Sequence, residues 1–173
     1  GRRAIMADPR WRKGDYYGRE APLDGLAVAR MIGHVTYLSD ATLTSKFGRK
    51  LENGDGYGFS LAPEFQVESY LKCKGEAFTR RFDANSYLYI TRAIDYFDLS
   101  KEYGTLDNAI GKVQSRFLLL SFTSDWLYPP CKSEEILSAL RRCGKEAVHR
   151  TIDSTYGHDA FLVEDAKITP TIA

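Results

Sequence analysis

The stretch Arg116-Phe-Leu-Leu-Leu-Ser-Phe122 is continuously apolar through its centre and ends directly in Thr-Ser-Asp. This pattern is typical of a β-strand buried on both faces, as in a parallel sheet. A helix is predicted next, with Ser133 as its N-cap and with basic residues in its last turn before Gly144. A second strand over about 147–152 completes a strand, helix, strand unit, which indicates an α/β fold with a parallel sheet. The core face expected for the helix comprises Ile136, Leu137, Leu140 and Cys143.

Each of the two predicted strands is followed by a loop that carries an ionisable residue. Asp125 follows the first strand and His158 follows the second. The carboxyl ends of parallel strands meet at one edge of a sheet, where ligands bind in open α/β folds, so the two side chains are expected to be near neighbours. The order acid then base is that of an α/β-hydrolase triad. The alternative is structural, with Asp125 capping a turn and His158 a hydrogen-bonded loop histidine.

The first hundred residues are predicted to be helical and aromatic-rich. A helix is expected from Pro22 toward Tyr37, where apolar residues recur at three-residue spacing. Further helices are expected from near Lys46, from Pro63 and over 86–97. The glycine-rich segment 52–58 predicts a loop. The opening segment reads as the tail of a helix stopped by Asp-Pro, so we expect the chain to be a fragment that begins inside an element.

Composition narrows the class of protein. The 173 residues are 43% hydrophobic and carry a net charge of only +1, which fits a globular domain and disfavours nucleic acid as a partner. The longest apolar run has four residues, so no membrane span is expected. The three cysteines lack C-x-x-C spacing, which favours reduced thiols in the cytoplasm over disulfides, and no metal site is expected.

Long stretches of the chain resemble the homoserine O-acetyltransferases, in the same order. These stretches are Ala4-Ile-Met-Ala-Asp-Pro-Arg-Trp11 with Gly14-Asp-Tyr-Tyr17, Gly25-Leu-Ala-Val-Ala-Arg-Met-Ile-Gly-His-Val-Thr-Tyr-Leu-Ser39, Val67-Glu-Ser-Tyr-Leu71, Arg81-Phe-Asp-Ala-Asn-Ser-Tyr-Leu-Tyr89, Ser121-Phe-Thr-Ser-Asp-Trp-Leu-Tyr-Pro-Pro130 and Asp153-Ser-Thr-Tyr-Gly-His-Asp-Ala-Phe-Leu162. The resemblance implies a partial α/β-hydrolase fold in which a helical cap precedes the last strands and helices of the parallel core sheet. It divides the chain into the end of a core helix (1–15), the cap (16–100) and the carboxyl-terminal part of the core (101–173).

The resemblance also implies an activity, the transfer of an acetyl group from acetyl-CoA to the hydroxyl of L-homoserine in methionine biosynthesis. A serine would form the acyl-enzyme, with His158 as general base and acid and Asp125 holding its tautomer. No cofactor would be bound, acetyl-CoA being a co-substrate, and a cytoplasmic homodimer formed through the cap is implied.

Three further residues match substrate-contacting positions of the family: Arg30, Tyr37 and Asp159. Homoserine is a zwitterion, so its site needs a cation for the carboxylate and an anion for the ammonium, and Arg30 and Asp159 have those signs. Helical spacing places Arg30, His34 and Tyr37 on one face. The alternatives are a solvated arginine and a packing aromatic, and His34 is interpreted as structural.

The chain departs from the family at the nucleophile. It contains no G-x-S-x-G, so the serine is expected in a missing amino-terminal half. Ser60 stands in Gly58-Phe-Ser-Leu-Ala62, but a polar glycine loop precedes it where a buried strand is required, and we reject it as nucleophile. Alone, the chain is expected to be inactive and to be marginally stable or to associate through an open sheet edge.

Several alternatives stay open on the sequence alone. The same scaffold could use succinyl-CoA or accept L-serine. In a different class, the chain could be a non-catalytic remnant that binds or oligomerises through its cap helices. Near the acid, Cys131 is interpreted as an inert thiol and Trp126 as a packing residue.

Overall fold

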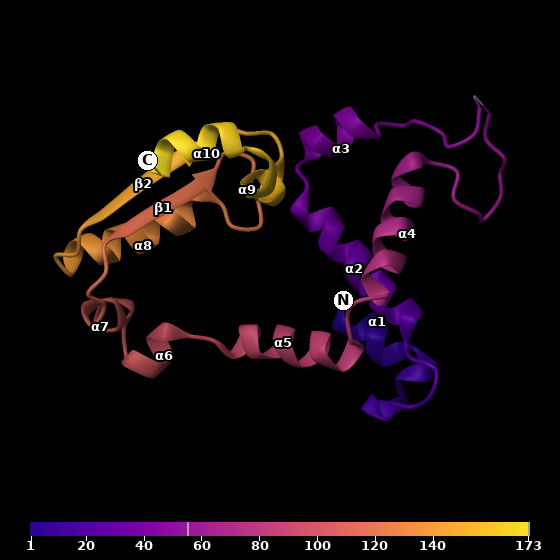
Figure 1. The fold of residues 1–173 in the computed structure, drawn as a ribbon, viewed down its shortest axis with the longest axis horizontal. Coiled ribbons are helices and arrows are strands. Elements are labelled where there is room, and N and C mark those ends of the chain that lie inside the picture. Colours follow the sequence, from indigo (N-terminus) through magenta and orange to yellow (C-terminus); the bar gives the residue numbers. More distant parts are fainter. Residues whose placement is uncertain (55, 173) are drawn as a thin grey trace. The chain divides into compact units, whose positions relative to one another are not determined.

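A computed structural model describes residues 1–54 and 56–172. Its contacts divide the chain into two compact units, which we describe separately (Figure 1). Of the described residues, the first unit contains those of 1–36 and 43–96, and the second contains 37–42 and 97–172. The chain therefore leaves the first unit for six residues, returns to it, and leaves it again after Tyr96. The three-part division expected from the family resemblance stays a prediction.

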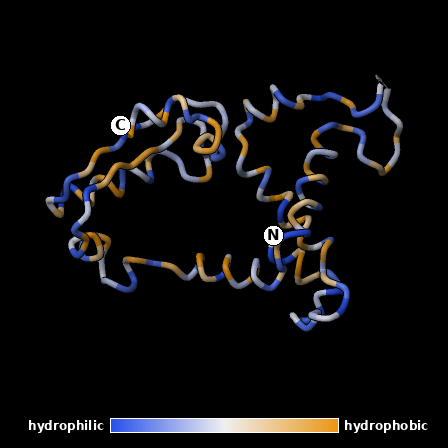
Figure 2. Tube along the Cα trace, in the orientation of Figure 1, coloured by the Kyte–Doolittle hydropathy of each residue, from blue (hydrophilic) through white to orange (hydrophobic). Residues whose placement is uncertain are grey.

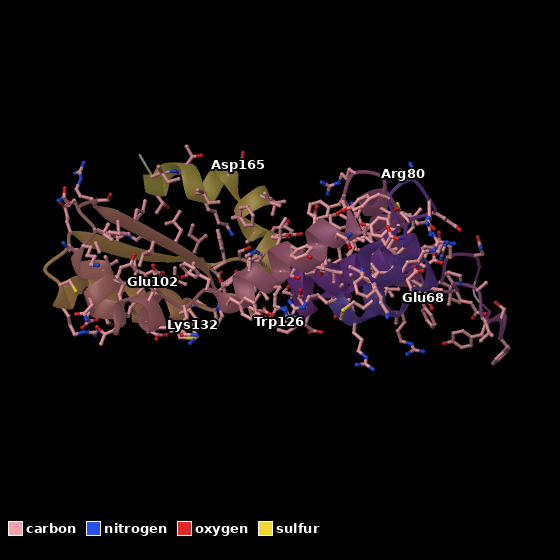
Figure 3. All side chains as sticks on the ribbon, turned by 90° about the horizontal axis from the view of Figure 1, so that it is seen from below. Glu68, Arg80, Glu102, Trp126, Lys132 and Asp165 are labelled. Carbon is pink, nitrogen blue, oxygen red and sulfur yellow. The ribbon has the colours of Figure 1, made fainter. Side chains whose placement is uncertain are left out.

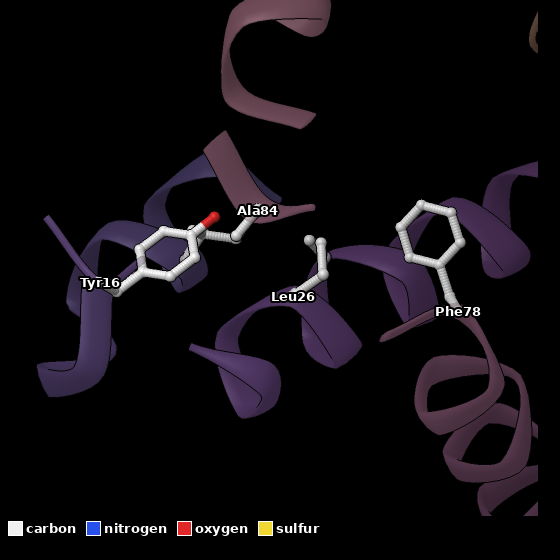
Figure 4. Packing of buried hydrophobic residues seen from close by; sticks show 6 residues of the cluster. Tyr16, Leu26, Phe78 and Ala84 are labelled. Carbon is white, nitrogen blue, oxygen red and sulfur yellow. The ribbon is translucent and has the colours of Figure 1, made fainter. Parts of the chain in front are cut away.

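The first unit is helical. Its elements are α1 (Arg2–Ala7), the 3-10 helix η1 (Pro9–Gly14), α2 (Leu23–Tyr37), α3 (Asp40–Lys46), α4 (Gln66–Thr79) and α5 (Ala84–Tyr96), with the ends of α2 and α3 at the boundary assigned to the second unit. The core of this unit gathers aromatic and aliphatic side chains from distant segments, among them Tyr16, Leu26, Phe78 and Ala84 (Figure 4). Gly25 lets α1 and α2 touch, because a Cβ there would lie 2.6 Å from the carbonyl oxygen of Ala4.

Asp8 joins α1, η1 and α2 in the first unit. Its buried carboxylate accepts hydrogen bonds from the backbone N–H groups of Arg10 and Gly25, both at 3.0 Å, and from Nε of Arg10 at 3.2 Å. Burial alone would raise the pKa of Asp8, but these hydrogen bonds outweigh it and hold the pKa below the ordinary value. The predicted stop of the first helix at Asp-Pro is confirmed, since α1 ends at Ala7 and Asp8 caps η1.

Two predicted helix starts in the first unit are wrong. A helix ends at Lys46 instead of beginning there, since α3 starts at Asp40, after Ser39 accepts the N–H of Thr42. The next helix, α4, starts at Gln66 and not at Pro63, because Phe65 still pairs with Leu51 in an antiparallel bridge. In the loop between them, the described residues of 52–58 form neither helix nor strand, as predicted.

The second unit contains the sheet. Its elements are α6 (Leu99–Tyr103), α7 (Leu106–Gly111), β1 (Phe117–Phe122), α8 (Pro130–Arg142), β2 (Ala147–Ile152), the 3-10 helix η2 (Gly157–Asp159), α9 (Ala160–Val163) and α10 (Asp165–Ile172). The strands pair in parallel, in register from Phe117 with Ala147 to Phe122 with Ile152. Both predicted strands and their parallel pairing are therefore confirmed.

Helices cover both faces of this sheet. The apolar residues of β1 are coloured as hydrophobic in Figure 2. One face packs against Ala139 and Leu140 of α8, and the other packs against Ala160 of α9 and Ile168 of α10. The helix between the strands begins at Pro130 with Pro129 as its N-cap, so the predicted cap at Ser133 is wrong. Proline at the first helical position is favourable because its missing N–H has no partner there in any case. Ala139 replaces Ile136 on the buried face, since Ile136 is 40% exposed.

Candidate active site

Asp125 sits in the loop that follows β1, and its carboxylate is only 6% exposed. One oxygen, Oδ1, accepts the backbone N–H groups of Leu127 and Tyr128, both at 2.9 Å. The other, Oδ2, lies 2.9 Å from Nδ1 of His158, which is 33 residues further along the chain. The carboxylate is thus fixed by its own loop and aimed by it at the imidazole.

His158 sits in η2, in the loop that follows β2. Its ring lies among three aromatic rings, with centroid distances of 5.2 Å to Tyr128, 5.6 Å to Phe161 and 5.8 Å to Tyr37. A quarter of the side chain remains exposed. Because Asp125 occupies Nδ1, the nitrogen left for exchanging a proton with another group is Nε2.

Short polar side chains tie the two loops together where the strands end. The hydroxyl of Thr123 donates to Asp153 at 2.9 Å and accepts the N–H of Ser154 at 3.1 Å. The hydroxyl of Ser124 accepts the N–H of Gly157 at 2.9 Å. These residues satisfy backbone groups that have left the sheet, so the loop sequences themselves hold Asp125 and His158 in place.

The other predicted site residues are divided between the units. Tyr37 belongs to the second unit, beside His158, and the half-buried Asp159 follows the histidine directly. Arg30 belongs to the first unit, where its guanidinium lies 4.9 Å from the centre of the Phe78 ring. The roles of all five predicted residues stay predictions, but the structure brings Asp125, His158 and Tyr37 together.

His34, interpreted as structural, is a buried member of the first unit. Its ring packs edge-on against Tyr70 at a centroid distance of 5.8 Å. Burial, together with the charges of Arg30, Lys74 and Lys46, lowers the pKa of His34 to about 4. This histidine is therefore neutral at physiological pH.

Ser60 lies in the loop between α3 and α4, and the residues on either side of it, Phe59 and Leu61, are almost fully exposed. Among the described residues 56–64 there is neither the strand nor the helix that a nucleophile elbow joins. Ser60 instead donates its backbone N–H to the carboxylate of Glu64. This geometry agrees with its rejection as a nucleophile.

A pair formed by a serine and a histidine within the sheet was not predicted from the sequence. Within the sheet, Ser121 of β1 lies 2.7 Å from Nε2 of His149 of β2. Ser121 is only 4% exposed, so its hydroxyl cannot reach a substrate, and the pair is structural. The signal was present as polar residues on one face of both strands, since Ser121 stands in register with Thr151.

The contacts by which Ser39 and Trp126 hold the loops were not predicted from the sequence. Trp126, interpreted as packing, is labelled in Figure 3; its indole N–H donates to the carbonyl of Leu38 at 3.2 Å. Ser39 donates to the carbonyl of Thr155. Their partners are far away in sequence, so no local pattern announces them.

Comparison with solved structures defines the class of fold. A homoserine O-acetyltransferase from Bacillus anthracis superposes with a TM-score of 0.87 over 99% of this chain and 45% of its own, at 23% identity. Esterase E22 superposes with a TM-score of 0.83 over 98% of this chain and 46% of its own, at 21% identity. The chain therefore has part of an α/β-hydrolase fold, as predicted.

Comparison with curated proteins is more specific. The homoserine O-acetyltransferase of Methanococcus vannielii is 52% identical over all 173 residues, which cover 35% of that protein. That of Methanohalobium evestigatum is 53% identical over 168 residues, covering 97% of this chain and 34% of that protein. The chain is thus a homologue of the homoserine O-acetyltransferases along its whole length, and it spans about a third of the length of these relatives. No family model matches it.

None of the helices in the described ranges is both long and apolar enough to cross a membrane.

Proposed function

We propose that this chain supplies the acid and the base of a homoserine O-acetyltransferase. The observation that carries the proposal is the 2.9 Å contact between Asp125 and His158, in a chain 52% identical throughout to proteins of that name. In this role Asp125 keeps the proton of His158 on Nδ1 and stabilises the imidazolium that forms when Nε2 accepts a second proton.

The proposed reaction has two steps. A serine hydroxyl gives its proton to Nε2 of His158 and attacks the thioester of acetyl-CoA; the thiol of CoA then leaves with that proton. In the second step Nε2 takes the proton of the homoserine hydroxyl and the resulting alkoxide attacks the acyl-serine; Nε2 then returns the proton to the departing serine oxygen, which releases O-acetylhomoserine and regenerates the free serine. The proposal places the serine outside these 173 residues, which contain no G-x-S-x-G and correspond to about a third of each relative.

The proposed acceptor site uses the three residues singled out by the resemblance. Tyr37 lies against the base, where an acceptor hydroxyl must arrive. Asp159 supplies a negative charge for the ammonium group of homoserine, and Arg30 supplies a positive charge for its carboxylate.

The test is a kinetic comparison in the full-length protein that contains this chain. Release of the CoA thiol from acetyl-CoA is followed with and without L-homoserine, in the wild type and in His158→Ala. We expect His158→Ala to lower kcat by about 10⁴-fold or more, because both steps need the base. His149→Ala is the matched control, since it removes the histidine of the adjacent strand that pairs with buried Ser121.

Near-normal turnover in His158→Ala would remove this residue from the mechanism and contradict the proposal. Succinyl-CoA and L-serine are run in parallel. If either is preferred over acetyl-CoA or homoserine by kcat/KM, the scaffold is an acyltransferase of different specificity.

A further inference from the structure

A short segment from early in the chain is packed onto both loops of the candidate site. Residues 37–42 follow α2 in sequence, yet their contacts assign them to the unit that contains the sheet. The carbonyl of Leu38 accepts the indole N–H of Trp126, the neighbour of Asp125. The next residue, Ser39, reaches the loop that carries His158. This segment therefore bridges the acid loop and the base loop.

The hydroxyl of Ser39 makes two hydrogen bonds and is shielded from water. It donates to the carbonyl of Thr155 and accepts the backbone N–H of Thr42 at 3.0 Å. Ser39 is only 6% exposed. The carbonyl of Thr155 also accepts the hydroxyl of Thr42 at 2.7 Å, so both of its lone pairs are used by this segment. Thr155 is three residues before His158, and its backbone is thus held on the segment.

Gly157 shows how closely the base loop approaches. A Cβ on this residue would lie 2.6 Å from the backbone nitrogen of Ser39 and 2.7 Å from the carbonyl oxygen of Tyr37. Only a residue without a side chain fits between them. The backbone next to His158 is therefore packed directly against the backbone of the segment, with no side chain between them.

We propose that Ser39 is a positioning residue for the base His158. By fixing the carbonyl of Thr155 it sets where η2 begins, and so keeps Nδ1 of His158 in line with Asp125. The proposal rests on the proposed function, since it requires His158 to be the base. Ser39 touches neither the imidazole nor a reacting atom; it acts through the loop, and small displacements of a catalytic group are costly because the reaction requires closely defined geometry.

The experiment separates positioning from simple helix capping. Ser39→Ala and Ser39→Thr are compared in the full-length protein, with Thr105→Ala as matched control. Thr105 caps α7 in the same unit through the N–H of Asn108 at 3.1 Å, so its removal also deletes a capping hydroxyl. We expect Ser39→Ala to lower kcat in both half-reactions about 10- to 100-fold with KM for homoserine little changed, while Thr105→Ala loses stability only.

Two further measurements make the result decisive. Ser39→Thr retains the hydroxyl, so its kcat is expected to be close to that of the wild type. The Nδ1 proton of His158, followed by NMR, is expected to exchange faster in Ser39→Ala than in the wild type, because its hydrogen bond to Asp125 is less well aligned. If Ser39→Ala does not fold, Thr42→Val, which removes the other hydroxyl on the Thr155 carbonyl, is measured instead and is expected to lower kcat to a smaller extent.

Wild-type kcat in Ser39→Ala, or in Thr42→Val where that variant is used, would overturn the proposal if His158→Ala is inactive. An equal loss of kcat in Ser39→Ala and Thr105→Ala would overturn it as well, since the effect would then follow stability. If His158→Ala retains turnover, it is the proposed function itself that fails.

Discussion

The geometry of the candidate site depends on a few individual residues. Asp125 and His158 could be placed from the sequence, because each directly follows an apolar strand and parallel strands end at one edge. Ser39 could not be placed, because its partner Thr155 is 116 residues away and a serine after a helix has many uses. The glycine at 157 was visible in the motif, but the backbone that crowds it was not.

Gly157 offers a test of that crowding. We expect Gly157→Ala to destabilise the chain by about 2–4 kcal/mol, because the residue has a φ of +70° and a Cβ would meet the backbone of Ser39 and Tyr37. The free energy of unfolding, obtained from urea titrations, measures this loss of stability. Gly144→Ala is the control, with a φ of +65° and open space around its Cβ, so only the conformational cost of about 1–2 kcal/mol is expected. Equal losses in the two variants would contradict the close approach.

Asp8 is a second residue whose charge has a measurable effect. We expect Asp8→Asn to destabilise the chain by about 1–3 kcal/mol at neutral pH, since it weakens the hydrogen bonds from Gly25 and Arg10. The pKa of Asp8 is lowered in the folded state, so its contribution is complete above the ordinary value of 3.8 and is lost as the pH falls through the folded value. The difference between variant and wild type should therefore shrink in acid.

The control for this prediction is Asp24→Asn, which removes an exposed carboxylate that contacts the same arginine. An exposed ion pair contributes little, so a change within about 0.5 kcal/mol is expected. A similar loss in both variants would show that burial of Asp8 is irrelevant.

Elements were predictable where local signals sufficed. Composition and period were enough to predict β1, β2 and the body of α2. The apolar residues predicted along α2, however, do not all lie on one face of the helix. A spacing of three residues drifts by about 60° per step on a helix, so Leu26 is buried whereas Val35 lies on the opposite side and is exposed. The start of α4 depended on a bridge between Leu51 and Phe65 that no local pattern reveals.

The packing of α2 against α4 makes stability depend on pH. His34 has a pKa of about 4 in the folded state against 6.5 ordinarily, through burial and the nearby charges of Arg30, Lys74 and Lys46. The unfolded chain therefore binds more protons between these values, and stability should fall by up to about 3 kcal/mol as the pH drops from 6.5 to 4. Unfolding in urea across this range measures it, and His34→Gln should flatten the dependence. An unchanged slope in the variant would assign the effect to other groups.

At the scale of the molecule, the resemblance read from the sequence is confirmed by relatives 52% and 53% identical. The division into two units was not foreseen in its detail, because six residues of the early chain join the later unit. Such an assignment depends on contacts between segments distant in sequence, which period and composition do not encode.

The 173-residue chain itself is expected to be catalytically silent. Mixed with acetyl-CoA and L-homoserine, it should release no thiol above the uncatalysed rate, because a base without a nucleophile cannot form the acyl-enzyme. A thiol-trapping dye measures this, with Ser60→Ala as control. Release that disappears in Ser60→Ala would show that Ser60 acts as a nucleophile and would contradict this prediction.

The chain is also expected to self-associate. The sheet described here has two strands, so each has one edge without a strand partner, and Leu118 and Val148 are partly exposed on one face. Sedimentation velocity should show a weight-average mass that rises with concentration, and Leu118→Lys should require about tenfold more protein for the same mass. Leu61→Lys, in an exposed loop of the other unit, should leave the association unchanged. A monomer at all concentrations would contradict this.

The bond between Ser39 and Thr155 also has a consequence for how the protein is made. During translation the serine leaves the ribosome 116 residues before its partner, which at about 5–20 residues per second is a wait of roughly 6–23 seconds. Residues 1–36 and 43–96 can pack in that time. Residues 37–42 lie between them in sequence, and their contact with Thr155 cannot yet form. Residues 37–42 are thus among the last of the early chain to reach their native contacts. A translational pause or a proteolytic cut before residue 155 would leave them exposed.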